Sequence, residues 1–113
     1  MIMIEKKVAV DHLEELLSVP GVDMIQWGPS DYTMSIGRPG QTTAPDVKAV
    51  ERRVFETALK MGVQPRAEIM SPDDAKYFLD MGVRHFSLGY DFFTLRGWWK
   101  TNGEGLRKAL AGH

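Results

Sequence analysis

Strand-type and helix-type patterns alternate four times along this chain of 113 residues. Each strand candidate is a short apolar run, and each is followed by apolar residues at helical spacing. A glycine or a proline then ends most units. Strands that alternate with helices in this way indicate a parallel sheet with helical cover and right-handed crossovers. The pattern therefore predicts an α/β fold of four parallel βα units in a single domain, residues 1–113.

The strand and helix bounds follow from the same patterns. Val10, Leu13, Leu16 and Leu17 stand at helical spacing and predict the first helix, and Pro45 and Asp46 open the second. Ser71 is expected to cap the third helix with Pro72 at its first position, and residues 91–110 form the fourth helix, with a break near Asn102-Gly103. The stretch from Gly28 to Pro45 holds no obvious packed element, so we expect a long functional loop there. The four strands are expected at Ile2–Glu5, Val22–Trp27, Pro65–Met70 and Phe86–Tyr90.

Two carboxylates stand directly after strand candidates. Glu5 ends the first strand, and Asp31 follows the second in the turn Gly28-Pro29-Ser30-Asp31. Because parallel strands end at one rim, where such folds keep their ligands, these side chains should lie at the same edge. Paired carboxylates suit a hard divalent cation that keeps open positions for water and substrate.

Other interpretations of these residues remain open. Asp31 is also a favoured turn residue, and a lone Glu5 beside two lysines is commonly a surface residue. Lys6 or Lys7 at the strand end could in principle form a Schiff base, although a lysine there is usually a solvated charge. The histidines have no motif around them, and Trp98 and Trp99 are typical of an apolar helix face in a core or an interface.

Composition excludes several classes of function. The net charge of -1 with 26% charged residues argues against nucleic acid and anionic membrane as partners. The chain has no cysteine, which excludes disulfides and thiol catalysis and fits a cytoplasmic setting. No apolar run approaches the roughly 18 residues of a membrane span, and the first residues do not form a signal peptide.

The motifs resemble one known family over nearly the whole chain. The matching runs include Ile4-Glu5-Lys6, the turn from Gly28 to Tyr32, the later Pro39-Gly40, and Gly89-Tyr90-Asp91. Together they resemble the HpcH/HpaI aldolases, class II pyruvate aldolases related to citrate lyase β-subunits. Members are (β/α)8 barrels of about 250 residues. The resemblance implies that this chain corresponds to the C-terminal half of such a TIM barrel.

The resemblance also implies roles for individual residues. Glu5 and Asp31 match the two metal ligands, and the metal would be Mg²⁺, Mn²⁺ or Co²⁺. The backbone around Gly28, Pro29 and Ser30 matches the segment that holds the carboxylate of a 2-keto acid such as pyruvate or oxaloacetate. The implied activity is that of a carbon–carbon lyase that stabilises a pyruvate enolate on the metal.

This chain departs from the family pattern in several places. Tyr32 stands where leucine is usual, and Arg66 and Glu68 fall in a strand that is usually apolar; with Trp27 they could line the distal pocket. The family's catalytic histidine and substrate-binding arginine belong to strands of the other half-barrel, so the catalytic residues here are unknown. Arg38, Arg66 or a partner chain are the candidate sources of the arginine.

Four parallel strands do not close a barrel. Ile2–Ile4 and Phe86–Tyr90 would both be unpaired edges, so we expect a homodimer or a higher oligomer in which these edges pair or the outer helices associate. The start at Met1, in the middle of the family barrel, suggests a truncated, split or engineered fragment. The alternative function is therefore a catalytically inactive half-barrel that only self-associates.

Overall fold

The sheet confirms the predicted parallel α/β architecture. The computed structural model describes residues 1–112, and the last residue of the predicted domain, His113, lies outside this range. All neighbouring strands pair in parallel, in the order β1-β2-β3-β4. The strands are β1 (Ile2–Ile4), β2 (Met24–Trp27), β3 (Gln64–Ile69) and β4 (His85–Leu88).

All four strands lie where the sequence predicted, but their ends differ from the predicted bounds by one or two residues, and the first helix is divided. The fourth strand was expected at Phe86–Tyr90, but β4 ends at Leu88 because Gly89 adopts a φ of 67°, which is incompatible with a continuing strand. The first helix is two short helices, α1 (Lys7–Asp11) and α2 (Leu13–Leu17), separated at His12. Val10, Leu13 and Leu17 are buried on both sides of this break, so the apolar pattern predicted the buried side correctly.

The stretch Gly28–Pro45, predicted as a loop without a packed element, contains the helix α3 (Pro29–Ser35). Pro29 occupies the first turn, where its fixed φ suits a helix start. Tyr32 and Thr33 are buried, and the Tyr32 ring lies 4.8 Å from that of Trp27. The prediction was wrong because a helix this short has too few residues to show a period in the sequence.

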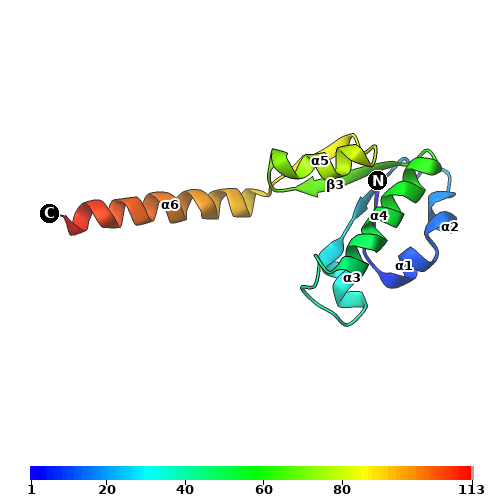
Figure 1. Cartoon of the computed structure of the whole chain (residues 1–113), viewed down its shortest axis with the longest axis horizontal. Coiled ribbons are helices and arrows are strands. Elements are labelled where there is room, and N and C mark those ends of the chain that lie inside the picture. The colour runs from blue at the N-terminus through cyan, green and yellow to red at the C-terminus, as the bar shows by residue number, and fades with distance from the viewer. Residues whose placement is uncertain (113) are drawn as a thin grey trace.

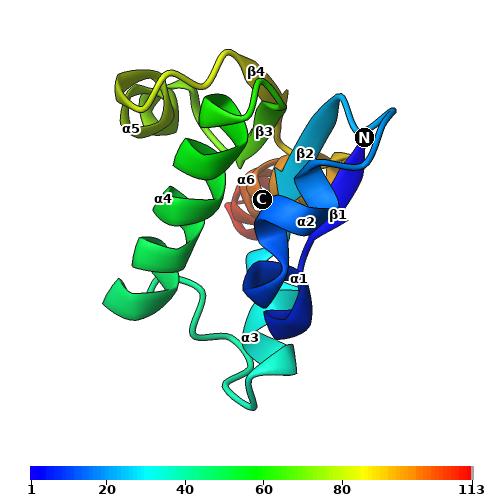
Figure 2. The ribbon, with the colours of Figure 1, turned by 90° about the vertical axis from the view of Figure 1, so that its right-hand side faces the viewer.

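The start of α4 (Pro45–Lys60) and the cap at Ser71 lie where the sequence predicted, but the α-helix after Ser71 begins only at Ala75. The helix α4 has its proline in the first turn, and Ser71 forms a capping box with Asp74. The capped turn is a 3₁₀ segment, η1 (Pro72–Asp74), which leads into α5 (Ala75–Asp80). Figure 2 shows α1, α2, α4 and α5 in front of or beside the strands.

The core lies between the sheet and these helices. Alternate strand residues, among them Ile4, Ile25 and Ala67, are almost completely buried, and they form one apolar cluster with Val54 and Phe55 of α4. The residues between them on each strand therefore point to the opposite face of the sheet. This second face carries the candidate site.

The last helix stands apart from the rest of the chain. The helix α6 (Asp91–Ala111) projects from the end of the sheet as a single arm (Figure 1), and none of its residues is buried. The expected break near Asn102-Gly103 is absent, and Trp98 and Trp99 are exposed, so they do not belong to the core of this chain. Among residues 1–112, no helix has both the length and the apolar character needed to cross a membrane.

The core predicts a strong dependence on Phe55. This side chain is 1% exposed and its ring lies 5.7 Å from that of Phe78. Replacing it with alanine should lower the free energy of unfolding by about 3–5 kcal/mol, because a large cavity remains. Urea unfolding checks this, with Met34→Ala as a control that should change stability by less than about 0.5 kcal/mol because Met34 is exposed. Equal effects of the two substitutions would contradict the assigned core.

Candidate functional site

The strand register aligns the residues of the second face in rows that run across the sheet. We call this face the inner face and define it by Met3, Gln26, Arg66 and Glu68. Met3 pairs with Gln26, Gln26 with Arg66, and Arg66 with His85, so these four form one row. The same register two residues further on aligns Glu5, Gly28, Glu68 and Ser87 at the carboxyl ends of the strands.

The Glu5 side chain lies directly over Gly28. A Cβ atom at Gly28 would come within 2.7 Å of the Glu5 Cβ, a distance that real Cβ atoms essentially never show, and within 3.3 Å of the Glu5 Oε2. The Gly28 amide donates to the Ile4 carbonyl at 3.0 Å, so the two strand ends are joined by a hydrogen bond. Glycine at position 28 therefore makes the space in which the Glu5 carboxylate lies.

Asp31 occupies the first turn of α3, immediately beyond this contact. The helix starts at Pro29, and the Tyr32 amide donates to the Gly28 carbonyl at 2.9 Å. Thr33 Oγ1 donates to the Ser30 carbonyl at 2.9 Å, which tightens the same turn. The predicted set Gly28, Pro29, Ser30 and Asp31 is thus one ordered strand-to-helix turn that begins beneath Glu5.

The donor set fits a weakly held hard cation. Within residues 1–112, no group of three or more histidine and acidic side chains lies close enough together to hold a metal ion. Two carboxylates are too few for a structural zinc site, which needs four protein ligands, but they suit Mg²⁺, which keeps several water ligands. A cation held by Glu5 and Asp31 would therefore need an open site in which water supplies the other ligands.

A chain of polar contacts runs across the inner face beside this turn. The Arg66 guanidinium donates to Gln26 Oε1, and Gln26 Nε2 donates to Glu68 Oε1. The other Glu68 oxygen accepts the hydrogen bond of the Tyr90 hydroxyl. Gln26 is 3% exposed, so its amide is a buried link between the arginine and the glutamate. Arg66 Nε is also buried and has no hydrogen-bond partner within residues 1–112.

This network keeps Tyr90 protonated. Partial burial of the phenol, followed by its hydrogen bond to Glu68 and the charge of that carboxylate, raises the pKa of Tyr90 to about 12. The hydroxyl is therefore a donor throughout the physiological pH range. Tyr90 also marks the exit from β4, so the network ties the last strand to β2 and β3.

The predicted pocket residues Trp27, Arg66 and Glu68 only partly come together. Trp27 and Glu68 line a cavity of about 150 Å³ with Glu51, Phe55 and Tyr90, whereas Arg66 is not among its lining residues. Trp27 is buried toward the helices, and its Nε1 has no hydrogen-bond partner within the described residues. Arg66 instead belongs to the inner face, two residues before Glu68 on β3.

Arg38, the other arginine named from the sequence, is already paired. Its guanidinium bonds to both carboxylate oxygens of Asp46, and its Nε donates to Gln41 at 2.9 Å. The hydrogen bond from Arg38 lowers the pKa of Asp46 below its usual value. Binding a substrate carboxylate would require Arg38 to leave this exposed ion pair, which closes the loop between α3 and α4.

Sequence reasoning missed Gln26 and Tyr90. Gln26 is a polar residue within the apolar run from Met24 to Trp27. A single polar side chain in a buried strand needs a hydrogen-bond partner, so the sequence did contain a signal for this contact. Tyr90 was assigned to the strand itself, so its position at the rim and its contact with Glu68 could not be predicted. Both residues act through Glu68, which the sequence did single out.

Comparison with known proteins finds one family. The family model described as HpcH/HpaI aldolase/citrate lyase matches residues 1–97. A curated 2-keto-3-deoxy-L-rhamnonate aldolase of Escherichia coli (strain K12) is 30% identical over 95 residues, which cover 80% of this chain and 34% of that protein. This chain therefore spans about a third of the length of the curated relatives it matches.

Solved structures show the same partial match. The crystal structure of the citrate synthase SbnG superposes with a TM-score of 0.87 at 28% identity, covering 96% of this chain and 45% of that chain. An HpcH/HpaI aldolase/citrate lyase family protein from Burkholderia cenocepacia superposes with a TM-score of 0.81 at 26% identity. The match covers 94% of this chain and 42% of that chain. Both neighbours contain this fold as part of a longer chain.

The polar network predicts the titration of Tyr90. Its pKa in the folded chain lies above the value of about 10 for an unfolded tyrosine, so this group stabilises the fold below pH 10 and the contribution is lost between pH 10 and 12. Glu68→Gln should lower the pKa of Tyr90 toward 10 without reaching it, because burial is the larger cause. Carbon NMR of labelled tyrosine rings measures this, with Tyr90→Phe to assign the signal and Glu14→Gln as the control. An unchanged pKa in Glu68→Gln would exclude the Tyr90–Glu68 contact.

Proposed function

The chain belongs to the HpcH/HpaI aldolase/citrate lyase family, and from this premise we propose that it forms the metal-binding half of a carbon–carbon lyase site for a 2-keto acid. The observation that carries the proposal is the Glu5 carboxylate lying over Gly28 at the start of the turn that holds Asp31. The parallel pairing of β1 with β2 supports the proposal, because Glu5 follows β1 directly and Asp31 lies in the helical turn after β2, beyond the carboxyl ends of neighbouring strands, where such folds bind ligands.

Each residue of the site has a role in this proposal. Glu5 and Asp31 hold a divalent cation, with Mg²⁺, Mn²⁺ or Co²⁺ as the candidates, and the backbone of Gly28 to Asp31 holds the keto-acid carboxylate. When bound, such a cation supplies Lewis-acid polarisation of a 2-keto carbonyl and charge stabilisation of the enolate. The proposed substrates are pyruvate or oxaloacetate, and the proposed setting is the cytoplasm.

The inner-face network forms the wall of this site. Glu68 accepts two hydrogen bonds, one from Gln26 and one from Tyr90, and these fix the orientation of its carboxylate. Arg66 contributes the positive charge of the network and is linked to Glu68 only through the Gln26 amide. We assign Arg66 as the group that attracts a substrate carboxylate, because an arginine suits planar, bidentate recognition of that anion.

The second candidate function is a half-barrel that self-associates without chemistry. The positions of β1 and β4 at the two edges of the described sheet and the exposed α6 favour it, because strand edges and exposed apolar side chains bind further strands or surfaces. The two candidates share the proposal that the chain acts as a homodimer or higher oligomer. They differ in whether a cation and a keto acid bind.

A metal titration separates them. We expect isothermal calorimetry with Mn²⁺ to show weak binding to the wild-type chain and a loss of more than about tenfold in affinity for Asp31→Asn or Glu5→Gln, because each removes a direct ligand. Asp23→Asn is the matched control, since Asp23 is exposed and precedes β2 at the opposite rim. Equal affinity for Asp31→Asn and Asp23→Asn would exclude the proposed site.

Catalysis should be slow in this chain alone. The family's catalytic histidine belongs to the other half-barrel, so this chain offers Arg66 for the substrate carboxylate but has no assigned group for proton transfer, and each of these functions contributes a large factor. We expect metal-dependent decarboxylation of oxaloacetate far below the roughly 10 per second of an ordinary enzyme. A coupled pyruvate assay measures it, with Asp31→Asn as the negative control. Turnover near 10 per second would mean that this chain carries a catalytic base outside the proposed set.

A further inference from the structure

The cavity next to the turn from Gly28 to Asp31 is lined by two side-chain carboxylates. Pro29 of this turn lines the cavity of about 150 Å³ together with Glu51 and Glu68. The same three residues also border a wider cleft of about 790 Å³. A keto acid held at the turn would therefore lie beside a carboxylate, and a carbon–carbon lyase needs a group that accepts a proton and returns it.

Glu51 already uses its charge in an ion pair. Its carboxylate lies 2.8 Å from Lys48 Nζ, and its side chain is only 6% exposed. Taking up a proton would cost Glu51 this ion pair. Glu68 forms no ion pair within residues 1–112, and the donors to its oxygens are a neutral amide and a neutral phenol. Glu68 is therefore the better placed of the two carboxylates to carry a proton.

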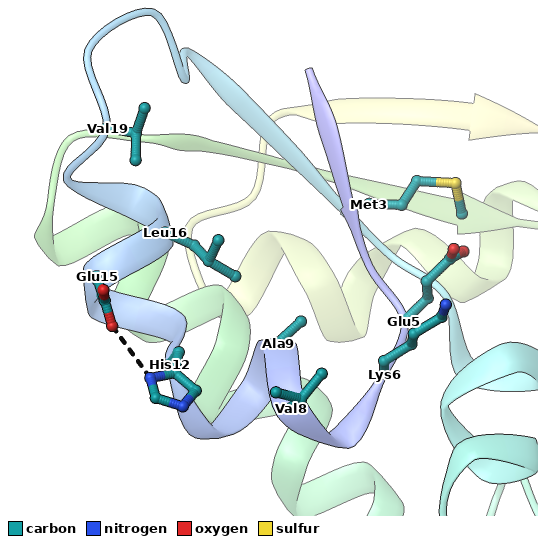
Figure 3. A pocket seen from close by; sticks show the side chains of 9 residues that line it. All are labelled: Met3, Glu5, Lys6, Val8, Ala9, His12, Glu15, Leu16 and Val19. Atoms are coloured by element: carbon teal, nitrogen blue, oxygen red, sulfur yellow. Dashed lines mark hydrogen bonds and ion pairs between the residues drawn. The ribbon is translucent and has the colours of Figure 1, made fainter.

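Glu68 and Glu5 flank one opening above Gly28. Figure 3 shows Met3 and Glu5 on the same side of β1, away from α1 and α2, and this side is the inner face to which Glu68 belongs. Neighbouring parallel strands lie about 4.8 Å apart, so the strand ends that carry Glu5 and Glu68 are separated by roughly 10 Å. Gly28, which stands between them in the row, has no side chain to fill this space.

Two hydrogen bonds set the orientation of the Glu68 carboxylate. Gln26 Nε2 donates to one oxygen, and the Tyr90 hydroxyl donates to the other. Burial and this bond raise the pKa of Tyr90 to about 12, so the phenol keeps its proton and remains a donor. Because a carboxylate has about four lone-pair sites in total, both oxygens keep the capacity to accept a proton.

Building on the proposed lyase function, we propose that Glu68 is its proton-transfer group, with Gln26 and Tyr90 as positioning residues. In the simplest reaction, a carbon–hydrogen bond at C3 of pyruvate breaks and its proton passes to Glu68. The electron pair of that bond forms the C2–C3 double bond, and the carbonyl pair moves to the C2 oxygen. A bound divalent cation would supply charge stabilisation at that oxygen. Return of the proton to C3 restores pyruvate, so no other reactant is needed.

The same carboxylate serves carbon–carbon cleavage. Glu68 takes the proton from the C4 hydroxyl of a 4-hydroxy-2-keto acid, and the electron pair of that O–H bond forms the carbonyl of the released aldehyde. The C3–C4 pair becomes the C2–C3 double bond of the enolate, to which Glu68 then returns the proton at C3. The carboxylate is regenerated, and the products are one aldehyde and pyruvate.

Alkylation by bromopyruvate tests where Glu68 lies relative to the substrate. Bromide is the leaving group on C3 of this reagent, so a carboxylate oxygen next to C3 displaces it and forms an ester. The chain has no cysteine, so the most reactive competing side chain is absent. With Mn²⁺ present, peptide mass spectrometry should find the label on Glu68, and excess pyruvate should reduce it by more than about tenfold through mass action. Glu68→Gln should lose this label, whereas Glu14→Gln, altered at an exposed residue, should keep it.

The position of the label separates this proposal from the metal site. A label on Glu51 or on lysines alone would overturn the assignment of Glu68, and so would the absence of any label. A label on Glu68 that forms equally well without Mn²⁺ or in Asp31→Asn would support the assignment of Glu68 and contradict the proposed metal site. The two failures are therefore distinguishable.

Deuterium exchange into the pyruvate methyl group measures the proton transfer itself. Mass spectrometry of pyruvate follows this exchange in D₂O, and no aldehyde is required. Glu68→Gln should lower the Mn²⁺-dependent rate by at least about 100-fold, which is a typical contribution of a general base. Glu68→Asp keeps a carboxylate and should retain more of the rate than Glu68→Gln. Circular dichroism should show that both variants stay folded, and equal rates for wild type and Glu68→Gln would overturn the proposal.

Tyr90→Phe tests the positioning role. It should lower the exchange rate at saturating pyruvate by about tenfold, because a misaligned base transfers protons slowly. The pyruvate concentration that gives half the maximal rate should stay unchanged, since Tyr90 contacts Glu68 and not the substrate. A change confined to that concentration would contradict the positioning role of Tyr90.

Discussion

The parallel pairing of β2 with β1 on one side and β3 on the other is the constraint from which the rest of the site follows. That register aligns Glu5, Gly28 and Glu68 in one row at the carboxyl ends of the strands. Gly28 lacks a side chain where one would collide with Glu5 Cβ, so the row has a gap between its two carboxylates. A slip of one residue would turn every side chain of β2 to the other face and place Trp27 in this gap.

The polar network depends on the same register. Gln26 stands beside Arg66 in the neighbouring row, which lets one amide accept from the guanidinium and donate to Glu68. The buried Gln26 amide uses both its oxygen and its nitrogen in hydrogen bonds. It separates the opposite charges of Arg66 and Glu68, which would otherwise pair directly. The arginine thus stays linked to the network while its charge is not neutralised by a short ion pair with Glu68.

The sequence predicted the parts that rest on long patterns. The four βα units, the start of α4 at Pro45 and the cap at Ser71 are confirmed, because hydrophobic period and capping chemistry are local signals. The helix at Pro29 was missed because a short helix shows no period. The Gln26–Glu68 contact joins residues 42 positions apart, so only the register of the sheet reveals it. The roles of Glu5 and Asp31 stay predictions.

The exposed arm and the open site have a common origin in the unclosed sheet. A barrel hides both edges and both faces, whereas four parallel strands leave an edge at β1, another at β4 and an inner face without opposing strands. The helix after an edge strand has a neighbour on one side only, so α6 leaves the body instead of packing on it. Strands beside β1 and β4 would close the sheet and enclose the inner face, on which the polar contacts of Gln26 with Arg66 and Glu68 lie.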